Sequence, residues 1–454
     1  MVRDPVVDKI VGHVERVAEH GVPVAARAAA KTFIADTLAV GIAGRRTPWR
    51  GEILDMLAAI RDPQEATVLG GGERLPLMHA AMLNAYQIHG QEFDCVHEGA
   101  VVHPMAAALP VLLGWAEREG GVSGARLIRA VVVAVDVAAT LGLCSRAPMR
   151  FFRPANAGGF GATVGLAMLA GLDGEQLRDA VGIYYGQCAG TMQAHREGTP
   201  QLAMQMGFAA RGAVTAVELA RRGMPGPRAS ITGEFGYFAL FDGAADPTPF
   251  DELGERWRIA GVSHKPFPNG RATHGGLDGL RRLMKEDRVT ADQIVACRFR
   301  VPPLTAQLVG RPAVEGMTAG FARLCLPYVG AVCLRRGNVE LGDFTEAALA
   351  DPDTLRLARR LTVVEDDNPD PNALLPQQVE VDLAEGRTIA VTVSSVLGSP
   401  ERPLSPEAAQ AKFTACWASV PDLPAEQGAV LWDAVRGLEA LEDVRPLAKL
   451  SGRW

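Results

Sequence analysis

Six acidic and imidazole side chains crowd into fifteen residues of the N-terminal half of the chain. They lie in the segment NAYQIHGQEFDCVHEGAVVHPMAAALP and are His89, Glu92, Asp94, His97, Glu98 and His103. Carboxylates and imidazoles at this density serve proton transfer or metal ligation, or simply cover a solvated surface. Three explanations are therefore open for this segment: proton transfer, metal ligation or a solvated surface.

The spacing of these side chains disfavours a metal site. No two of the histidines have the i, i+4 spacing of a metal-binding HExxH helix, and Asp94 and His103 lie nine residues apart across a glycine-containing loop. Apolar helices are predicted on both sides of the segment and should anchor it near a core. Because loops on rigid elements often carry catalytic residues, catalysis and a solvated surface remain equally open at this point.

A second stretch, SHKPFPNGRATHGG at residues 263–276, gathers the cationic and imidazole side chains of Lys265, Arg271 and His274 around two prolines and three glycines. A solvated surface loop is one explanation. The other is a proline-stiffened loop that directs positive groups into a cleft for an anionic substrate. The stretch alone does not decide between these explanations.

Composition narrows the class of protein. The 454 residues are 48% apolar and 22% charged, which is typical of a folded protein with two domains or one large and one smaller domain. The net charge is -6 and no basic stripe occurs, so we expect no nucleic-acid partner. No secretory apolar region or membrane-length apolar run is seen, which favours a cytoplasmic protein without a membrane partner. The seven scattered cysteines predict free thiols.

The hydrophobic pattern changes twice along the chain. Alanine-rich helical spacing continues to about residue 262, and β-branched alternation then appears in QIVACRFRVPP and PQQVEVDLAEGRTIAVTVSSV. Helical patterning returns from SPEAAQAKFTACW. We therefore predict a mostly α protein with a smaller α+β part: helical residues 1–265, an α+β domain at 266–403, and helical residues 404–454 that return to the first part.

Seven segments in this order resemble the MmgE/PrpD family, whose members include 2-methylcitrate dehydratase, cis-aconitate decarboxylase and iminodisuccinate epimerase. The segments are ADTLAVGIAG, LNAYQIHGQEFDCVHEGAVVHP, GFGATVGLAMLAGLD, ARRGMPGPRASITGEFGYFALF, HKPFPNGRATHGGLDGL, ARLCLPYVGAVCLRRGNVELGDF and PLSPEAAQAKF. The resemblance implies a large helical domain with an inserted α+β lid, a homodimer, and a site between the two domains. It also implies that neither a metal nor an organic cofactor is needed.

The resemblance also implies roles in the site for individual residues. The family stretch NGTLAHALDFDDTH falls on residues 84–97, where His89, Phe93, Asp94 and His97 match, while Cys95 and Val96 depart from it. This alignment implies that Asp94 is the acidic site residue and that His103, in its HP dipeptide, is the site histidine.

The family stretch KPYPxCRxTH falls on the second segment, so the resemblance implies roles for Lys265, Arg271 and His274. Proton removal next to a carboxylate, or loss of carbon dioxide, builds negative charge that preorganised cationic donors stabilise. A bidentate guanidinium such as that of Arg271 grips a carboxylate in a way that an ammonium does not.

Two departures from the family pattern alter the expected site. The usual FHPTGT is FRPANA here, which places Arg153 at a family histidine, and PQLAMQMG places Leu202 and Gln205 at a family lysine and histidine. Arg153 is a permanent cation that is able to hold a carboxylate but not to act as an acid or base. Leu202 removes one charged contact, and this suggests a bulkier, less charged substrate.

These observations predict a cofactor-free lyase acting on a small carboxylic acid, with dehydration or hydration placed ahead of decarboxylation. The predicted catalytic residues are Asp94, His103, Lys265 and His274, and the predicted substrate-binding residues are Arg271, Arg153, His97 and Leu202. An epimerase or isomerase of a dicarboxylic acid is the enzymatic alternative. A catalytically silent carboxylate-binding protein is the other alternative, which retention of four polar site residues disfavours.

Overall fold

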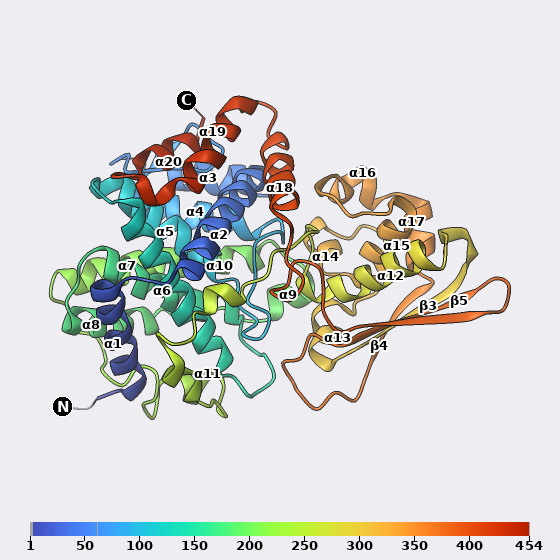
Figure 1. Cartoon of the computed structure of the whole chain (residues 1–454), viewed down its shortest axis with the longest axis horizontal. Coiled ribbons are helices and arrows are strands. Elements are labelled where there is room, and N and C mark those ends of the chain that lie inside the picture. Colours follow the sequence, from blue (N-terminus) through green and yellow to red (C-terminus); the bar gives the residue numbers. More distant parts are fainter. Residues whose placement is uncertain (1–2, 61, 454) are drawn as a thin grey trace.

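Packed helices make up the N-terminal half of the chain (Figure 1). The computed structural model describes residues 3–60 and 62–453. The helices of this half are α1 (Pro5–His20), α2 (Val24–Ala43), α3 (Arg50–Ala58), α4 (Leu77–His89), α5 (Pro104–Glu119), α6 (Gly124–Leu143), α7 (Arg153–Leu169), α8 (Gly174–Tyr185), α9 (Gln193–Glu197), α10 (Gln201–Arg221) and α11 (Tyr237–Phe241). Two short antiparallel strands, β1 (Ala66–Thr67) and β2 (Arg74–Leu75), lie between α3 and α4.

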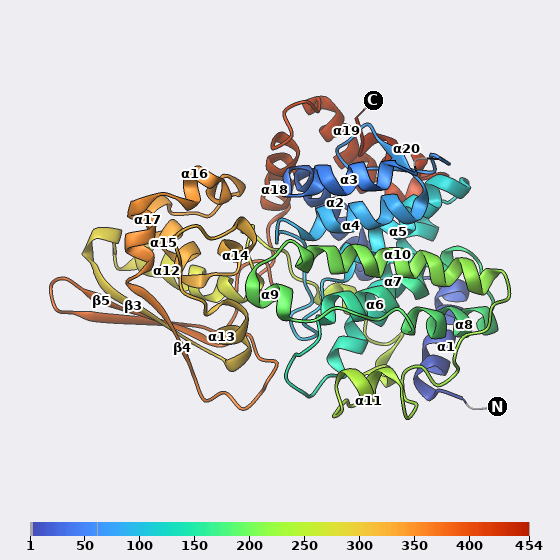
Figure 2. The same ribbon diagram turned by 180° about the vertical axis from the view of Figure 1, so that it is seen from behind.

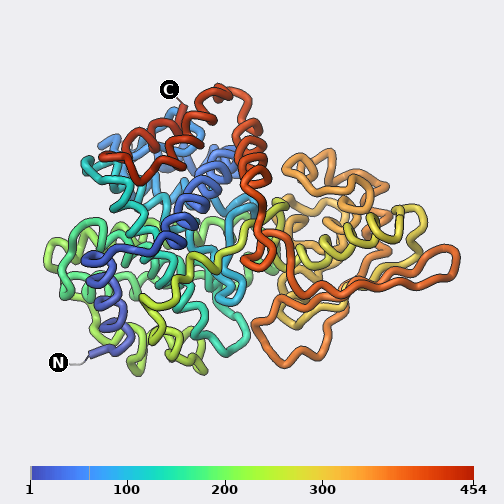
Figure 3. The backbone as a smooth tube through the Cα atoms, viewed as in Figure 1, coloured from blue at the N-terminus to red at the C-terminus, as the bar shows by residue number. Residues whose placement is uncertain are grey.

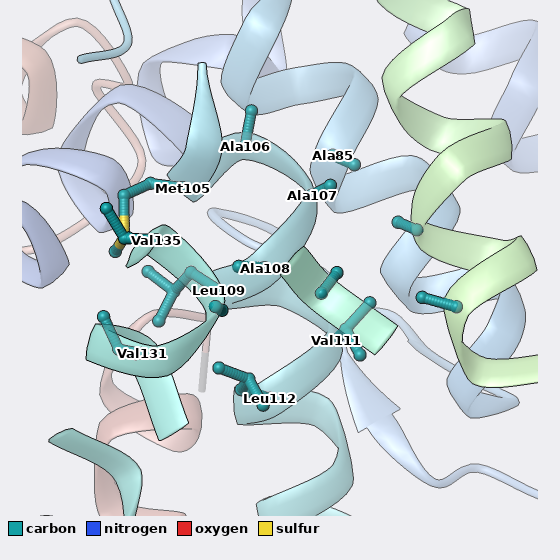
Figure 4. Packing of buried hydrophobic residues seen from close by; sticks show 14 of the residues in the cluster. Ala85, Met105, Ala106, Ala107, Ala108, Leu109, Val111, Leu112, Val131 and Val135 are labelled. Carbon is teal, nitrogen blue, oxygen red and sulfur yellow. The ribbon is translucent and has the colours of Figure 1, made fainter. Parts of the chain in front are cut away.

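Small residues let the central helices approach closely. In Figure 4, Met105 and Leu109 of α5 lie beside Val131 and Val135 of α6. A Cβ placed on Gly161 of α7 would lie 2.2 Å from the Ala134 carbonyl oxygen of α6, so only glycine fits at that contact. The alanine-rich texture of the sequence thus builds a dense helical core in which the loop between α4 and α5 is anchored.

A four-stranded sheet and six helices form the second part of the molecule. The sheet order is β4-β3-β5-β6, with β3 parallel to β4 and antiparallel to β5, and β5 antiparallel to β6. The strands are β3 (Ile294–Val301), β4 (Leu361–Glu365), β5 (Gln377–Leu383) and β6 (Thr388–Val393), and the helices are α12 (His274–Glu286), α13 (Pro303–Val309), α14 (Ala319–Arg323), α15 (Leu326–Arg336), α16 (Glu346–Leu349) and α17 (Pro352–Ala358).

The last part of the chain runs back from the sheet to the helical part, as Figure 3 shows in red. It contains α18 (Pro406–Ala418), α19 (Ala425–Arg436) and α20 (Arg445–Leu450). Phe413, Leu431 and Leu447 from these helices join the same hydrophobic core as α1 to α10. Residues of the sheet and its helices, such as Phe299 and Leu326, belong to a second core.

The mostly α character with a smaller α+β part, predicted from the sequence, is confirmed. The domain boundaries after residues 265 and 403 remain predictions. Seen from behind, α9 and α18 lie at the border between the two parts (Figure 2). Within the described residues, the helices are all too short or too polar to cross a membrane.

Candidate active site

Two helix ends bring a pair of histidines together. His89 is the last residue of α4, and His103 immediately precedes Pro104 at the start of α5. Their rings lie 4.8 Å apart between centroids in an edge-to-face arrangement. The predicted loop between these helices therefore folds back on itself and gathers its polar side chains at one place.

Asp94 holds both histidines from inside the protein. Its Oδ2 atom lies 3.0 Å from Nδ1 of His89 and 3.0 Å from Nδ1 of His103. The carboxylate is fully buried. Burial alone would raise the pKa of Asp94, but His103 and His89 outweigh it and hold that pKa well below its usual range. Asp94 is therefore a carboxylate that orients two imidazoles.

The hydrogen bonds to Asp94 show which ring nitrogen of each histidine Asp94 holds. A carboxylate accepts hydrogen bonds, so Nδ1–H of each imidazole donates to it, and Nε2 is the nitrogen that Asp94 does not hold. Nε2 of His89 is buried and lies 3.5 Å from Glu92 Oε1. Within the described part of the chain, Nε2 of His103 has no hydrogen-bond partner, and the His103 side chain is 12% exposed. Neutral His103 thus presents a basic nitrogen to solvent.

The pKa values of the two histidines are shifted in opposite directions. Burial lowers the pKa of His103, and the opposing effect of Asp94 does not restore it. Burial also acts to lower the pKa of His89, but Asp94 and Glu92 outweigh it and raise that pKa. Compared with ordinary histidines, this arrangement favours the neutral form of His103 and the protonated form of His89, which is the pattern of a base paired with an acid.

Lys265 reaches the same site from the second predicted stretch. An antiparallel bridge between Val96 and Ser263 brings the two segments side by side. The Lys265 ammonium is buried and donates to Glu92 Oε2 at 2.9 Å and to the Glu92 carbonyl at 3.0 Å, and it lies 3.8 Å from Asp94 Oδ1. Burial would raise the pKa of Glu92, but Lys265 and the histidines lower it. Lys265 and Glu92 therefore form a buried ion pair behind the histidines.

Glu92 adopts an unusual backbone conformation at this point. Its φ angle is +50°, in the left-handed region that non-glycine residues rarely occupy. Such a conformation costs about 1–3 kcal/mol and persists where surrounding contacts hold it. The two hydrogen bonds from Lys265 to Glu92 supply those contacts.

A cavity of ≈ 530 Å³ opens beside this cluster and is lined by residues from both parts of the molecule. His89, Glu92 and Leu202 line it from the helical part, and Arg323 and Phe344 line it from the α+β part. The predicted residue Leu202 therefore lies at the cavity, on the first turn of α10. Asp94, His103 and Lys265 lie behind His89 and Glu92.

Arg323 is a cavity residue that the sequence did not single out. It is the last residue of α14 and is 5% exposed. Its guanidinium donates to the Pro268 carbonyl and to the Gln91 side-chain oxygen, and it lies 4.1 Å from the centre of the Phe344 ring. Burial lowers its pKa to about 9, so it stays charged at neutral pH. No salt bridge joins Arg323 to a carboxylate among the described residues.

Arg271 and His274 lie beside the site in a separate network. Arg271 donates from Nε and Nη2 to Glu98 Oε1 at 3.0 and 2.8 Å, and from Nη1 to the carbonyls of His264 and Leu397. Its Nη1 also lies 3.1 Å from Nδ1 of His274. A substrate carboxylate would have to displace Glu98 to bind Arg271. Neither side chain lines the cavity.

Arg153 and His97 do not line this cavity either. Arg153 donates to the Ala100 carbonyl at 3.2 Å, to Ser145 Oγ at 2.8 Å and to the Asn372 side-chain oxygen at 2.9 Å. His97 Nδ1 accepts from the Ala100 amide, and burial together with Arg258 lowers its pKa to about 4. The structure therefore brings Asp94, His103 and Lys265 together behind His89 and Glu92, and Leu202 lines the cavity itself. The cavity is lined neither by those three residues nor by Arg153, His97, Arg271 and His274.

His89, Asp94 and His103 are also the residues best placed to hold a metal ion. One ligand atom from each lies within 4.8 Å of the others. Both histidines, however, direct Nδ1 at the same carboxylate oxygen at hydrogen-bond distance. A cation bound between them would replace both hydrogen bonds, and two imidazoles with one carboxylate would be its ligands.

Comparisons with known proteins cover both parts of the molecule. The MmgE/PrpD N-terminal domain matches residues 8–249, and the MmgE/PrpD C-terminal domain matches residues 267–436. The chain is 26% identical to a cis-aconitate decarboxylase from Aspergillus terreus over 447 residues, which cover 93% of this chain and 90% of that protein. It is 27% identical to the cis-aconitate decarboxylase of Homo sapiens over 439 residues, 92% of this chain and 89% of that protein.

Proposed function

The chain belongs to the MmgE/PrpD family, and on that premise we propose that it is a lyase that transfers a proton next to the carboxylate of a small carboxylic acid. The observation that carries the proposal is the pair of histidines that share Asp94 through Nδ1, with Nε2 of His89 facing Glu92 Oε1 at 3.5 Å and Nε2 of His103 unpaired among the described residues. The similarity to cis-aconitate decarboxylases supports a lyase of carboxylic acids. In this proposal the enzyme needs no cofactor.

His103 acts as the base in the proposed reaction. Its neutral Nε2 takes the proton from the carbon next to the substrate carboxylate, and Asp94 stabilises the imidazolium that forms. Arg323 holds that carboxylate and stabilises the charge that develops on it. The Lys265–Glu92 ion pair fixes the loop that carries Asp94.

His89 acts as the acid. In a dehydration, its proton goes to the leaving hydroxyl, the carbon–oxygen bond breaks, and water and an alkene result. In a decarboxylation, the carbon–carbon bond to a carboxylate breaks, carbon dioxide leaves, and the His89 proton neutralises the carbanion, so no base removes a proton from carbon. The similarity to cis-aconitate decarboxylases makes this the second route open to the site.

Epimerisation is a second candidate that one observation favours. Two imidazoles with opposite pKa directions are suited to remove a proton from one face of a carbon and to return it from another. This scheme needs no leaving group. It predicts deuterium incorporation and inversion at a carbon next to a carboxylate, without an alkene or carbon dioxide.

Proton NMR in deuterium oxide tests the proposal. The purified chain is incubated with methylcitrate, cis-aconitate, citramalate and aspartate-derived acids, with and without a chelator. We expect deuterium next to a carboxylate together with product formation, and turnover in the presence of the chelator supports the cofactor-free scheme. Ligand binding without exchange in any acid would instead identify a silent carboxylate-binding protein.

His103→Gln provides the decisive variant. Loss of the base is expected to lower turnover by about 10²- to 10⁴-fold while ligand affinity is retained. His20→Gln, at an exposed side chain on α1, is the matched control and should leave turnover unchanged. Full turnover in His103→Gln would contradict the assignment of the base.

A further inference from the structure

The charges of the cavity wall limit how many carboxylates a ligand can bring. Glu92 is already paired with Lys265, and Asp94 is paired with the two histidines. Arg323 is the only lysine or arginine among the described lining residues, and its partners are neutral oxygens. Glu346 lies at the exposed part of the wall and adds a negative charge. The wall therefore offers one cation without a carboxylate partner, which suits a ligand with a single carboxylate.

Much of the remaining wall is apolar, although Thr47, Thr199 and Thr318 also line it. It is lined by Pro48, Trp49, Leu202, Met317, Phe344 and Leu349, which come from both parts of the molecule. Leu202 is 7% exposed and stands close to the polar end formed by His89 and Glu92. A volume of ≈ 530 Å³ falls within the range of pockets that enclose drug-sized ligands. A small polyacid would leave most of this apolar wall in contact with water.

From this distribution of charge we infer that the cavity binds a monocarboxylic acid with an extended apolar tail. The carboxylate lies on Arg323 beside the histidines, and the tail lies along Leu202, Met317 and Phe344. This inference rests on the proposed function, because it takes the reacting carboxylate to be the one that Arg323 holds. Binding itself is measured without turnover, so the two claims are tested separately.

Calorimetric titration of the whole chain with straight-chain carboxylates tests the inference. The probes are butanoate, hexanoate and octanoate, with tricarballylate as the polyacid and octanamide as the uncharged analogue. Each added CH₂ should tighten binding by about fourfold, as expected for about 0.8 kcal/mol per buried CH₂. Octanoate should bind at least tenfold more tightly than octanamide and tricarballylate.

Three variants test where the carboxylate and the apolar tail of the ligand bind. Leu202→Lys should flatten the dependence on chain length, because it places an ammonium in the apolar wall. Leu240→Lys is the matched control on the exposed face of α11, where the leucine is 54% exposed, and it should keep the wild-type dependence. Arg323→Gln should weaken octanoate by about ten- to hundredfold while octanamide is unaffected.

The outcomes separate this inference from the proposed function. The inference is overturned if the wild type binds butanoate, hexanoate and octanoate equally tightly, or if it binds tricarballylate more tightly than octanoate. This holds even if deuterium exchange occurs. The same chain-length dependence in Leu202→Lys as in the wild type also overturns it, because the tail would then lie elsewhere. A fourfold dependence that Leu202→Lys removes supports the inference even if no acid is turned over.

Discussion

At the scale of single residues, the two histidines on Asp94 predict a bell-shaped pH dependence. His103 must be neutral to act as a base, and its lowered pKa means that activity rises with pH below about 6.5, the ordinary histidine value. His89 must be protonated to act as an acid, and its raised pKa means that activity falls only above that value. The optimum is therefore expected near neutrality.

Asp94→Asn should move this profile to lower pH. The Asp94 carboxylate raises the pKa of both His89 and His103, so its removal lowers both and shifts both limbs in the acidic direction. The measurement is kcat/KM between about pH 5 and pH 9. Asp251→Asn, at an exposed side chain, is the control and should leave the limbs in place. A shift toward alkaline pH would contradict the shared role of Asp94.

The individual residues could be predicted only in part. Asp94, His103 and Lys265 were singled out because their segments match a family pattern; the structure brings them together, and their roles remain predictions. His89 lies in the same segment, but nothing in the spacing shows that α4 ends there and turns its ring toward Asp94. Arg323 has no local signal, since it meets the cavity only through the packing of α14.

Arg153 shows how little a sequence alignment says about where a side chain lies. Its place in the alignment suggests a site residue, and its neighbour Phe152 does pack near His89, with ring centroids 5.7 Å apart. The Arg153 side chain starts α7 and extends instead to Ser145 and Asn372. A sequence position does not specify the direction of a side chain at a helix start.

At the scale of elements, α18 supports the loop that carries Asp94. Lys412 of α18 donates to the Phe93 carbonyl at 2.9 Å, lies 4.1 Å from the centre of the Phe93 ring and contacts Asp36 of α2 at 2.6 Å. Phe93 directly precedes Asp94. The C-terminal helices thus contribute to the placement of the proposed site without touching the cavity.

Lys412→Met should lower the free energy of unfolding by about 3–5 kcal/mol, because it leaves the buried Asp36 carboxylate without its cation. Denaturant unfolding measures the change. Lys9→Met removes an exposed ion pair and should change stability by less than about 1 kcal/mol. The double variant Asp36→Leu with Lys412→Met should recover most of the loss. A Lys412→Met protein as stable as the wild type would show that this contact does not hold α18.

The elements themselves were predicted best where the hydrophobic pattern is long. The alanine-rich segments correspond to helices such as α2 and α10, and the alternating segments correspond to β3, β5 and β6. The strand β4 was missed, because Leu361–Glu365 is short and directly follows a helical pattern. Its place in the sheet depends on parallel pairing with β3, a contact between distant segments.

At the scale of the whole molecule, burial should protect all seven thiols. Six cysteines are buried and Cys188 is half-buried, and burial raises the pKa of Cys144 to about 12. A chromogenic aromatic disulfide at pH 8 should therefore react only slowly with the native protein. After unfolding, it should react with all seven thiols. A thiol that reacts within seconds in the native protein would contradict this expectation.

The residues that line the cavity come from two parts of the molecule with separate hydrophobic cores. This arrangement affects how mutations can change the ligand that the cavity binds. Asp94 and the two histidines belong to the helical part, whereas Arg323, Phe344 and Leu349 belong to the other part. Under the proposed function, substitutions in α14–α16 change the acid-binding side of the cavity and leave His89, Asp94 and His103 unaltered. Ligand preference and proton transfer are then separately mutable, because they depend on different parts of the chain.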